Sequence, residues 1–242
     1  MKLFDDKPVN MGNVGGFGFS AVRPETLGST EYTLVTLVLD KTGSVTSFAD
    51  DLFRIKNAIV EACKKSPRCD YLLLRLVEFN SQVDEVHGFK PLAEVDTAAY
   101  QTPICGGMTA LNDATFSAVG ATNAFAKSLA DQDYLANAIV VVVTDGDDNH
   151  SRTRASDVAA EIKKGISGEH LESLRTVLVG VNASQCRSAL ESFQREAGID
   201  QYVDVADATP QKLARLAEFV SRSISAQSQS LGTGGPSQAL TF

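Results

Sequence analysis

Short apolar runs alternate with amphipathic segments along most of this chain. Four runs are rich in Val, Ile and Leu and are almost continuously apolar, which is typical of strands buried on both faces of a sheet. These predicted strands are Thr33–Leu39, Tyr71–Phe79, Ala138–Val143 and Arg175–Val181. Other segments carry apolar residues at helical spacing. The predicted helices are Ser47–Lys65, Ala110–Ala130, Ala155–Ile166, Ser184–Ala197 and Gln211–Ser223.

The alternation of strands and helices predicts an α/β fold in which right-handed crossovers join parallel strands and helices cover both faces of the sheet. One join breaks this rule, because the stretch EFNSQV is too short for a crossover. Gln82–Phe89 is therefore predicted to return as an antiparallel edge strand, and Gln201–Val205 is a weaker last strand. The expected architecture is a three-layer α/β/α Rossmann-like domain with a mostly parallel sheet.

The two ends of the chain differ from this body. Residues 1–30 form an N-terminal extension with the stretch NVGGFGFSAV, which fits either an added edge strand or a segment that stays mobile until it binds. From Ala226 the chain reads AQSQSLGTGGPSQALTF, which is too polar and too rich in Gly and Ser to pack against a core. The sequence thus predicts one domain over residues 31–225 and a flexible tail over residues 226–242.

The composition of the chain says little about its fold but excludes some classes of binding partner. With 43% hydrophobic and 21% charged residues, the chain has the balance of a compact globular protein. Its formal net charge of −8 repels polyanions and its Lys and Arg residues are scattered, so we expect neither nucleic acid nor a membrane as a partner. We find no secretory signal, no bilayer span and no CxxC pair among the four cysteines, so we expect a cytoplasmic protein with free thiols.

Polar residues with metal-binding chemistry follow the predicted strands. In an open α/β sheet, ligands gather at the carboxyl ends of the strands. The first loop there is DKTGS, in which every second side chain points the same way if the loop is extended. Asp40, Thr42 and Ser44 can then present three oxygens to one point. Thr109 in GGMT and Asp145 in TDGDDN can complete the ring.

Two carboxylates and three hydroxyls make a hard, all-oxygen set that suits Mg²⁺, Mn²⁺ or Ca²⁺ and not zinc or copper. Each residue also has an ordinary explanation. Ser44 and Thr109 precede helices and could be N-caps, Asp145 could belong to a turn, and Asp40 could merely end a strand. A purely structural role without metal is thus the alternative, but the joint occurrence in three loops favours a metal site.

This arrangement resembles the von Willebrand factor A (VWA) domain family, whose metal-ion-dependent adhesion site (MIDAS) reads D-x-S/T-x-S, then a distant T and a distant D. The positions of that motif match Asp40, Thr42, Ser44, Thr109 and Asp145. The resemblance spans about Glu31–Ser225 and includes an antiparallel edge hairpin. Its one departure is Thr42, where serine is commoner, and the hydroxyl is retained.

The resemblance implies a protein–protein interaction module, not an enzyme, that holds Mg²⁺ and uses it to capture an acidic side chain of a partner protein. Bacterial intracellular members of this family often work beside MoxR-type AAA+ ATPases or in stress gene clusters, such as those of tellurium resistance. A protein of that kind is the partner that the resemblance suggests.

An enzymatic interpretation of the same residues is the alternative. DKTGS also resembles the DKTGT of P-type ATPases and the haloacid dehalogenase superfamily, in which the acid, here Asp40, is a nucleophile that forms an aspartyl phosphate. TDGDDN shows a partial likeness to the GDGxND loop of that group. Against this, a helix opens soon after Ser44 where that superfamily inserts a β flap, and no lysine lies in a recognisable motif.

Overall fold

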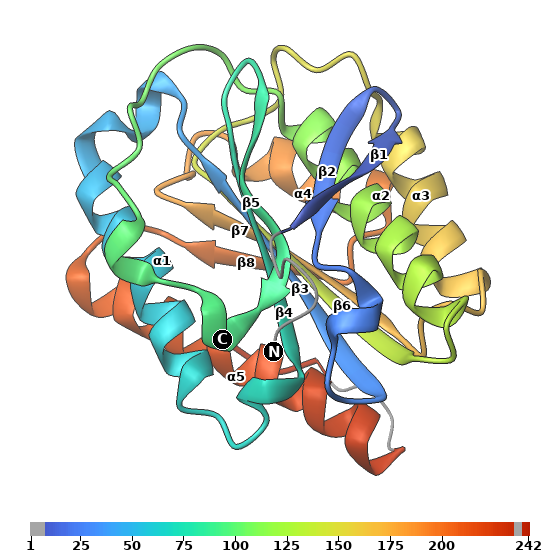
Figure 1. Cartoon of the computed structure of the whole chain (residues 1–242). Helices are drawn as coiled ribbons and strands as arrows, with labels where there is room; N and C mark the ends of the chain where they lie inside the picture. Colours follow the sequence, from blue (N-terminus) through green and yellow to red (C-terminus); the bar gives the residue numbers. More distant parts are fainter. Residues whose placement is uncertain (1–7, 235–238) are drawn as a thin grey trace.

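The computed structural model describes residues 8–234 and 239–242. Its described part contains one sheet in the order β1-β2-β5-β4-β3-β6-β7-β8. The strands are β1 (Val9–Val14), β2 (Phe17–Ala21), β3 (Glu31–Asp40), β4 (Leu72–Phe79), β5 (Val83–Pro91), β6 (Leu135–Thr144), β7 (Leu174–Val181) and β8 (Gln201–Val205). The helices are α1 (Ala49–Lys64), α2 (Leu111–Ala130), α3 (Ala155–Ser167), α4 (Arg187–Ala197) and α5 (Pro210–Thr233). The predicted α/β class and its mostly parallel sheet are confirmed (Figure 1).

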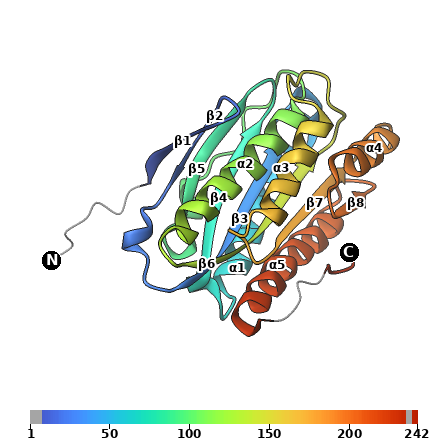
Figure 2. The ribbon, with the colours of Figure 1, turned by 90° about the vertical axis from the view of Figure 1, so that its right-hand side faces the viewer.

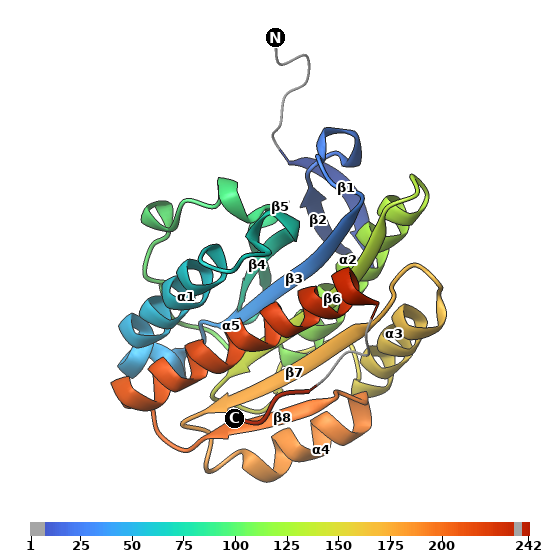
Figure 3. The same cartoon turned by 90° about the horizontal axis from the view of Figure 1, so that it is seen from below.

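The helices lie in two layers, one on each face of the sheet. Alternate residues of β3 point to opposite faces. Leu34 and Val38 pack in the core beneath α2, α3 and α4, which cover one face (Figure 2). Val35 and Leu37 pack in the core shared with α1 and α5, which run across the other face (Figure 3). No helix of the described residues is long and apolar enough to cross a membrane.

The central strand β3 brings distant loops together. It runs parallel to β4 on one side and to β6 on the other, with Asp40 opposite Phe79 and Leu39 opposite Val143. These strands therefore end at the same edge of the sheet, so the loop after Asp40 lies beside the loop after Thr144. This edge is where an open parallel sheet offers a ligand site.

The strand β5 is antiparallel to β4, as predicted, but it is not the edge of the sheet. β2 pairs with it through Ala21 and Phe89, and β1 lies outside β2 (Figure 1). Gly88 permits this close approach, because a Cβ there would lie 2.0 Å from the Ser20 carbonyl oxygen. The N-terminal extension thus contributes strands to the sheet, which the sequence left open; residues 1–7 of it lie outside the described residues.

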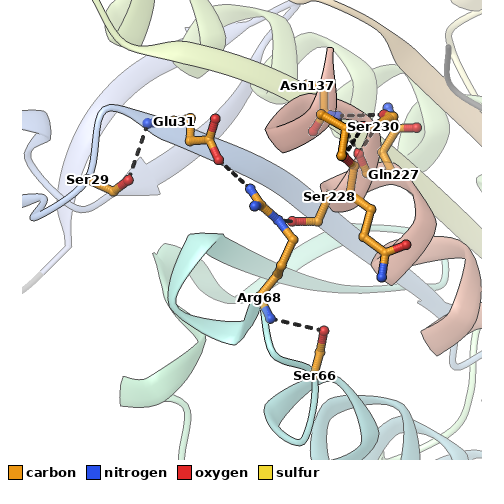
Figure 4. Close-up of polar contacts among 10 residues, drawn as sticks. Ser29, Glu31, Ser66, Arg68, Asn137, Gln227, Ser228 and Ser230 are labelled. Atoms are coloured by element: carbon orange, nitrogen blue, oxygen red, sulfur yellow. Dashed lines mark hydrogen bonds and ion pairs between the residues drawn. The ribbon is translucent and has the colours of Figure 1, made fainter. Parts of the chain in front are cut away.

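The flexible tail predicted from Ala226 is wrong over its first part, because α5 continues to Thr233. The sequence there is polar, yet Gln227 and Ser228 are buried and hydrogen-bonded. Gln227 Nε2 donates to Ala138 O at 3.0 Å. Arg68 Nε donates to Ser228 Oγ at 2.9 Å (Figure 4). Buried polar side chains with partners fasten this half of the helix, which a pattern of apolar positions does not reveal.

The last described residues also contact the body of the protein. Gln201 Nε2 donates to Leu240 O at 2.9 Å, and the Phe242 ring lies edge-on to Phe219 with 5.6 Å between centroids. Residues 235–238 of the predicted tail lie outside the described residues. The bounds of the predicted domain, residues 31–225, stay a prediction.

Candidate metal centre

The loop after β3 is built around Asp40, whose side chain is only 1% exposed. Its Oδ1 accepts a hydrogen bond of 2.8 Å from the Thr42 backbone N–H. This contact turns the chain so that Thr42 Oγ1 and Ser44 Oγ lie 3.1 Å apart. A 3₁₀ helix over Gly43–Phe48 then leads directly into α1. The three oxygen-bearing side chains of this loop are therefore neighbours, as predicted, but through a turn into the 3₁₀ helix and not through the extended loop that the prediction assumed.

The loop after β6 joins this group through two hydroxyl contacts. Ser44 Oγ donates to Asp145 Oδ1 at 2.8 Å. Thr144 Oγ1 donates to Asp40 Oδ2 at 2.6 Å and accepts from the Gly146 N–H at 3.2 Å. Both carboxylates are thus held by hydroxyl groups from neighbouring strands and loops, at the edge where β3 and β6 end.

The third loop places Thr109 against the loop after β6. Thr109 N–H donates to Asn149 Oδ1 at 2.8 Å, and Thr109 O accepts from Asn149 N–H at 2.9 Å. The Thr109 hydroxyl lies 3.7 Å from the point that a Cβ on Gly146 would occupy. The hydroxyl therefore lies beside the residue that follows Asp145. All the predicted ligand residues belong to loops that meet at one edge of the sheet.

The helix-capping explanation of Ser44 and Thr109 does not hold. The N-cap residues of α1 and α2 are Phe48 and Ala110, and neither of these side chains caps its helix. The first turn of α2 is capped from another loop: Asp148 Oδ2 accepts a hydrogen bond of 2.8 Å from the Asn112 N–H. The hydroxyls of Ser44 and Thr109 are thus available for another role.

Electrostatics at the centre favour a cation. The pKa of Asp40 is raised to about 6. Burial is the main cause, the charge of Asp145 adds to it, and hydrogen bonds from Thr144 and Thr42 act in the opposite direction. Burial also raises the pKa of Asp145, while the hydrogen bond from Ser44 lowers it. Among the described residues, neither carboxylate has an ion pair with Lys or Arg. The nearest lysine in sequence, Lys41, pairs instead with Asp84 at 2.8 Å.

The donor set fits a hard divalent cation. Across the described ranges, no three His, Cys, Asp or Glu side chains come together in a metal-binding cluster. The centre combines two carboxylates with hydroxyls, and such oxygen surroundings suit Mg²⁺, Mn²⁺ or Ca²⁺. A divalent ion would offset the charge of these two acids, which pair with no Lys or Arg in the part of the chain that the structure describes. The residues present therefore fit the ion that their pattern suggested.

Two residues that organise this centre are not among the predicted ligands. Thr144 ends the apolar run VVVVT, and a hydroxyl directly before the acid was the available signal. Asn149 ends the stretch TDGDDN and is not one of the predicted ligands, although it holds both backbone groups of Thr109. Neither contact follows from sequence spacing, because each joins loops that are distant in the chain.

The β flap expected of the dehalogenase alternative does not follow Asp40. Ser44 already lies in the 3₁₀ helix over Gly43–Phe48, which leads directly into α1. A phosphoryl group on Asp40 would need a lysine to balance its charge, and Lys41 Nζ, the nearest in sequence, pairs with Asp84 at 2.8 Å.

No family model and no curated protein matches the chain. Solved structures do match. The PilB minor pilin from Streptococcus sanguinis aligns over 93% of this chain and 69% of its own, at 15% identity and a TM-score of 0.59. Proximal thread matrix protein 1 from the mussel byssus, with a zinc-occupied MIDAS motif, aligns over 80% and 46%, at 17% identity and a TM-score of 0.55.

An ArnB paralog, VWA2 from Sulfolobus acidocaldarius, aligns over 79% of this chain and 46% of its own, at 11% identity and a TM-score of 0.50. The chain spans about half the length of the mussel and archaeal proteins. At these identities the likeness concerns the fold alone. The fold of this chain is that of VWA-like domains.

Proposed function

We propose that this protein is an interaction module that binds a divalent cation, Mg²⁺ in the first place, and uses it to capture a carboxylate of a partner protein. The observation that carries the proposal is that two carboxylates, without a Lys or Arg partner among the described residues, lie with three hydroxyls at one edge of the sheet. The proposed ligands are Asp40, Thr42, Ser44, Thr109 and Asp145. The protein has no catalytic role in this account.

The burial of these residues suggests which side of the ion is open. Asp40, Thr42 and Thr109 are buried, whereas Ser44 is exposed and Asp145 is half-buried. An ion held among them would have protein oxygens beneath it and solvent above it. Two carboxylates balance the charge of a divalent ion, and a ligand position on the solvent side can exchange water for a carboxylate.

The structural relatives support a role in adhesion by analogy of fold. One is a minor pilin, another is a pilus adhesin, SpaC from Lactobacillus rhamnosus GG, and a third carries a zinc-occupied MIDAS motif. The resemblance seen in the sequence suggests a MoxR-type AAA+ ATPase or a stress-cluster protein as partner, in the cytoplasm. Both the partner class and the compartment are part of the proposal.

The test is a pull-down from native lysate with the immobilised protein in Mg²⁺, followed by elution with EDTA. Asp40→Ala and Asp145→Ala are compared with the wild-type protein, and Asp147→Ala, an exposed acid of the same loop, is the matched control. We expect a partner that the wild type and the control release into EDTA and that neither site variant retains. Equal retention by both site variants, with circular dichroism unchanged, would refute the proposal.

A second measurement separates the enzymatic alternative. The protein is incubated with acetyl phosphate and Mg²⁺, and a phosphoenzyme that is stable in acid and cleaved by hydroxylamine is sought. We expect none. Such a species on the wild type, absent from Asp40→Ala, would favour the dehalogenase chemistry.

A further inference from the structure

Two large apolar side chains are exposed beside the candidate metal centre. Ile104 is 92% exposed and Met108 is 47% exposed, and both belong to the loop that ends at Thr109. The loop lies along the loop after Asp40, because Gly106 N–H donates to Lys41 O at 2.9 Å. Exposed apolar side chains that gather next to a binding site are a feature of protein-interaction surfaces.

The loop that carries these side chains is fastened to the hairpin between β4 and β5. Asn80 Nδ2 donates to Gly106 O at 2.9 Å, and Met108 N–H donates to Ser81 Oγ at 2.8 Å. Ala110 N–H also donates to Asn80 O, at 2.9 Å. The loop is therefore held in place on both sides of Gly107, and Met108 lies within this held stretch, two residues after Gly106.

We propose that Ile104 and Met108 form the apolar half of a composite docking site, whose other half is the metal ion. The occupant is a partner segment in which an acidic side chain lies next to a large aliphatic or aromatic residue. The carboxylate binds the ion and the apolar neighbour covers Ile104 and Met108. This inference rests on the proposed function, since it needs a carboxylate held at the metal.

The physical reason is a division of roles. A carboxylate on a divalent ion gives a strong but unselective contact, since every Asp or Glu can provide it. Burial of apolar surface beside it adds affinity only for segments that place an apolar residue there. Ile104 and Met108 therefore determine which acidic segment binds, while the ion determines that the segment is acidic.

The experiment uses a displayed peptide library with a fixed central Asp and random flanking positions, panned against the full chain in Mg²⁺ and eluted with EDTA. The test variant is the double substitution Ile104→Ser with Met108→Ser. The control combines Val86→Ser with Leu135→Ser, because these side chains are 43% and 52% exposed and lie elsewhere. The strongest wild-type peptide is then measured against all three proteins by fluorescence anisotropy.

We expect Leu, Ile, Met or Phe to be enriched beside the Asp for the wild type and the control. The double variant should keep EDTA-sensitive recovery but lose that enrichment, and its affinity for the selected peptide should fall about 10-fold. Recovery with random flanks, or equal affinity for all three proteins, would overturn this inference and leave the metal function intact.

Two further outcomes of these experiments would point to a different explanation of the site. An absence of EDTA-sensitive recovery with the wild type would overturn the proposed function itself, and this inference with it. A dimer that the wild type forms in sedimentation and the double variant does not would show that a second copy covers Ile104 and Met108, which would also overturn the inference.

Discussion

Thr144 Oγ1 donates a hydrogen bond of 2.6 Å to Asp40 Oδ2, and this bond joins the ends of β6 and β3 inside the protein. Both residues are buried, so the contact is shielded from water. It occupies one oxygen of Asp40, while the Thr42 backbone N–H binds the other. The orientation of the most buried carboxylate of the centre is thus set by a residue that is not itself a proposed ligand.

The first prediction concerns Thr144→Val, which keeps the shape of the side chain and removes its hydroxyl. The Asp40 carboxylate loses the donor that orients it, so affinity for Mn²⁺, measured by isothermal titration calorimetry, should fall about 10- to 100-fold. Thr144→Ser restores the donor and should bind within a few-fold of the wild type. Unchanged affinity of Thr144→Val would show that the bond has no part in metal binding.

The second prediction concerns Asn149, whose side chain and backbone both bind Thr109. Asn149→Ala removes the acceptor for the Thr109 N–H, so the Thr109 amide should exchange its hydrogen faster and Mn²⁺ affinity should drop about 10-fold. His150→Ala is the matched control, because His150 reaches Thr109 only through its backbone N–H. If both variants exchange and bind alike, Asn149 does not position Thr109.

The third prediction concerns the stability of the protein in acid. His87 stacks on Tyr100, and its Nε2 lies 2.7 Å from the Tyr100 hydroxyl. The pKa of His87 is lowered to about 4, chiefly by burial. The positive charges of Lys90, Arg75 and Lys56 also lower it, whereas the hydrogen bond to Gly88 O raises it. The unfolded chain has a histidine pKa near 6.5, so it binds the proton more readily than the folded protein.

The stability that depends on neutral His87 is therefore complete above about pH 6.5 and is lost as the pH falls toward 4. Between pH 7 and pH 4.5, in EDTA, the wild type should lose about 2 kcal/mol more unfolding free energy than His87→Gln. The raised pKa of Asp40 acts in the opposite direction and is common to both proteins. Urea denaturation measures the difference, with the exposed His150→Gln as control. Equal losses in wild type and His87→Gln would contradict the prediction.

The fourth prediction concerns the polar half of α5. Gln227→Ala leaves buried acceptors on Ala138 and Ser173 without their donor, which should lower the free energy of unfolding by about 1 to 3 kcal/mol. Gln229→Ala changes an exposed residue on the same turn and should have almost no effect. If the two variants have equal stability, residues from Ala226 behave as a tail and not as part of the helix.

The strands and helices that are continuously or periodically apolar could be predicted from the sequence. Thr33–Leu39 lies within β3 and Ala155–Ile166 lies within α3, because each hides an apolar face in a core. The position of β5 inside the sheet was left open, because the glycine-rich stretch NVGGFGFSAV fitted either an added strand or a mobile segment; in the structure β2 pairs with β5, and Phe19 and Ala21 of β2 are buried in the core. The extension of α5 was missed because hydrogen bonds bury its polar residues.

The convergence of the five candidate ligands could be predicted because each lies just after a strand or just before a helix, where topology alone fixes the neighbours. Thr144 and Asn149 could not, because their roles depend on distances between loops. The exposure of Ile104 was also hidden, since an isoleucine in sequence is expected to be buried.

One divalent cation is proposed to lie among five side chains, those of Asp40, Thr42, Ser44, Thr109 and Asp145. The most direct measurement is anomalous diffraction from a crystal of the protein soaked in Mn²⁺. We predict one anomalous peak among these five side chains, at about 2.0 to 2.6 Å from the ligating oxygens. A peak elsewhere in the molecule, or none at this edge of the sheet at millimolar Mn²⁺, would contradict the claim.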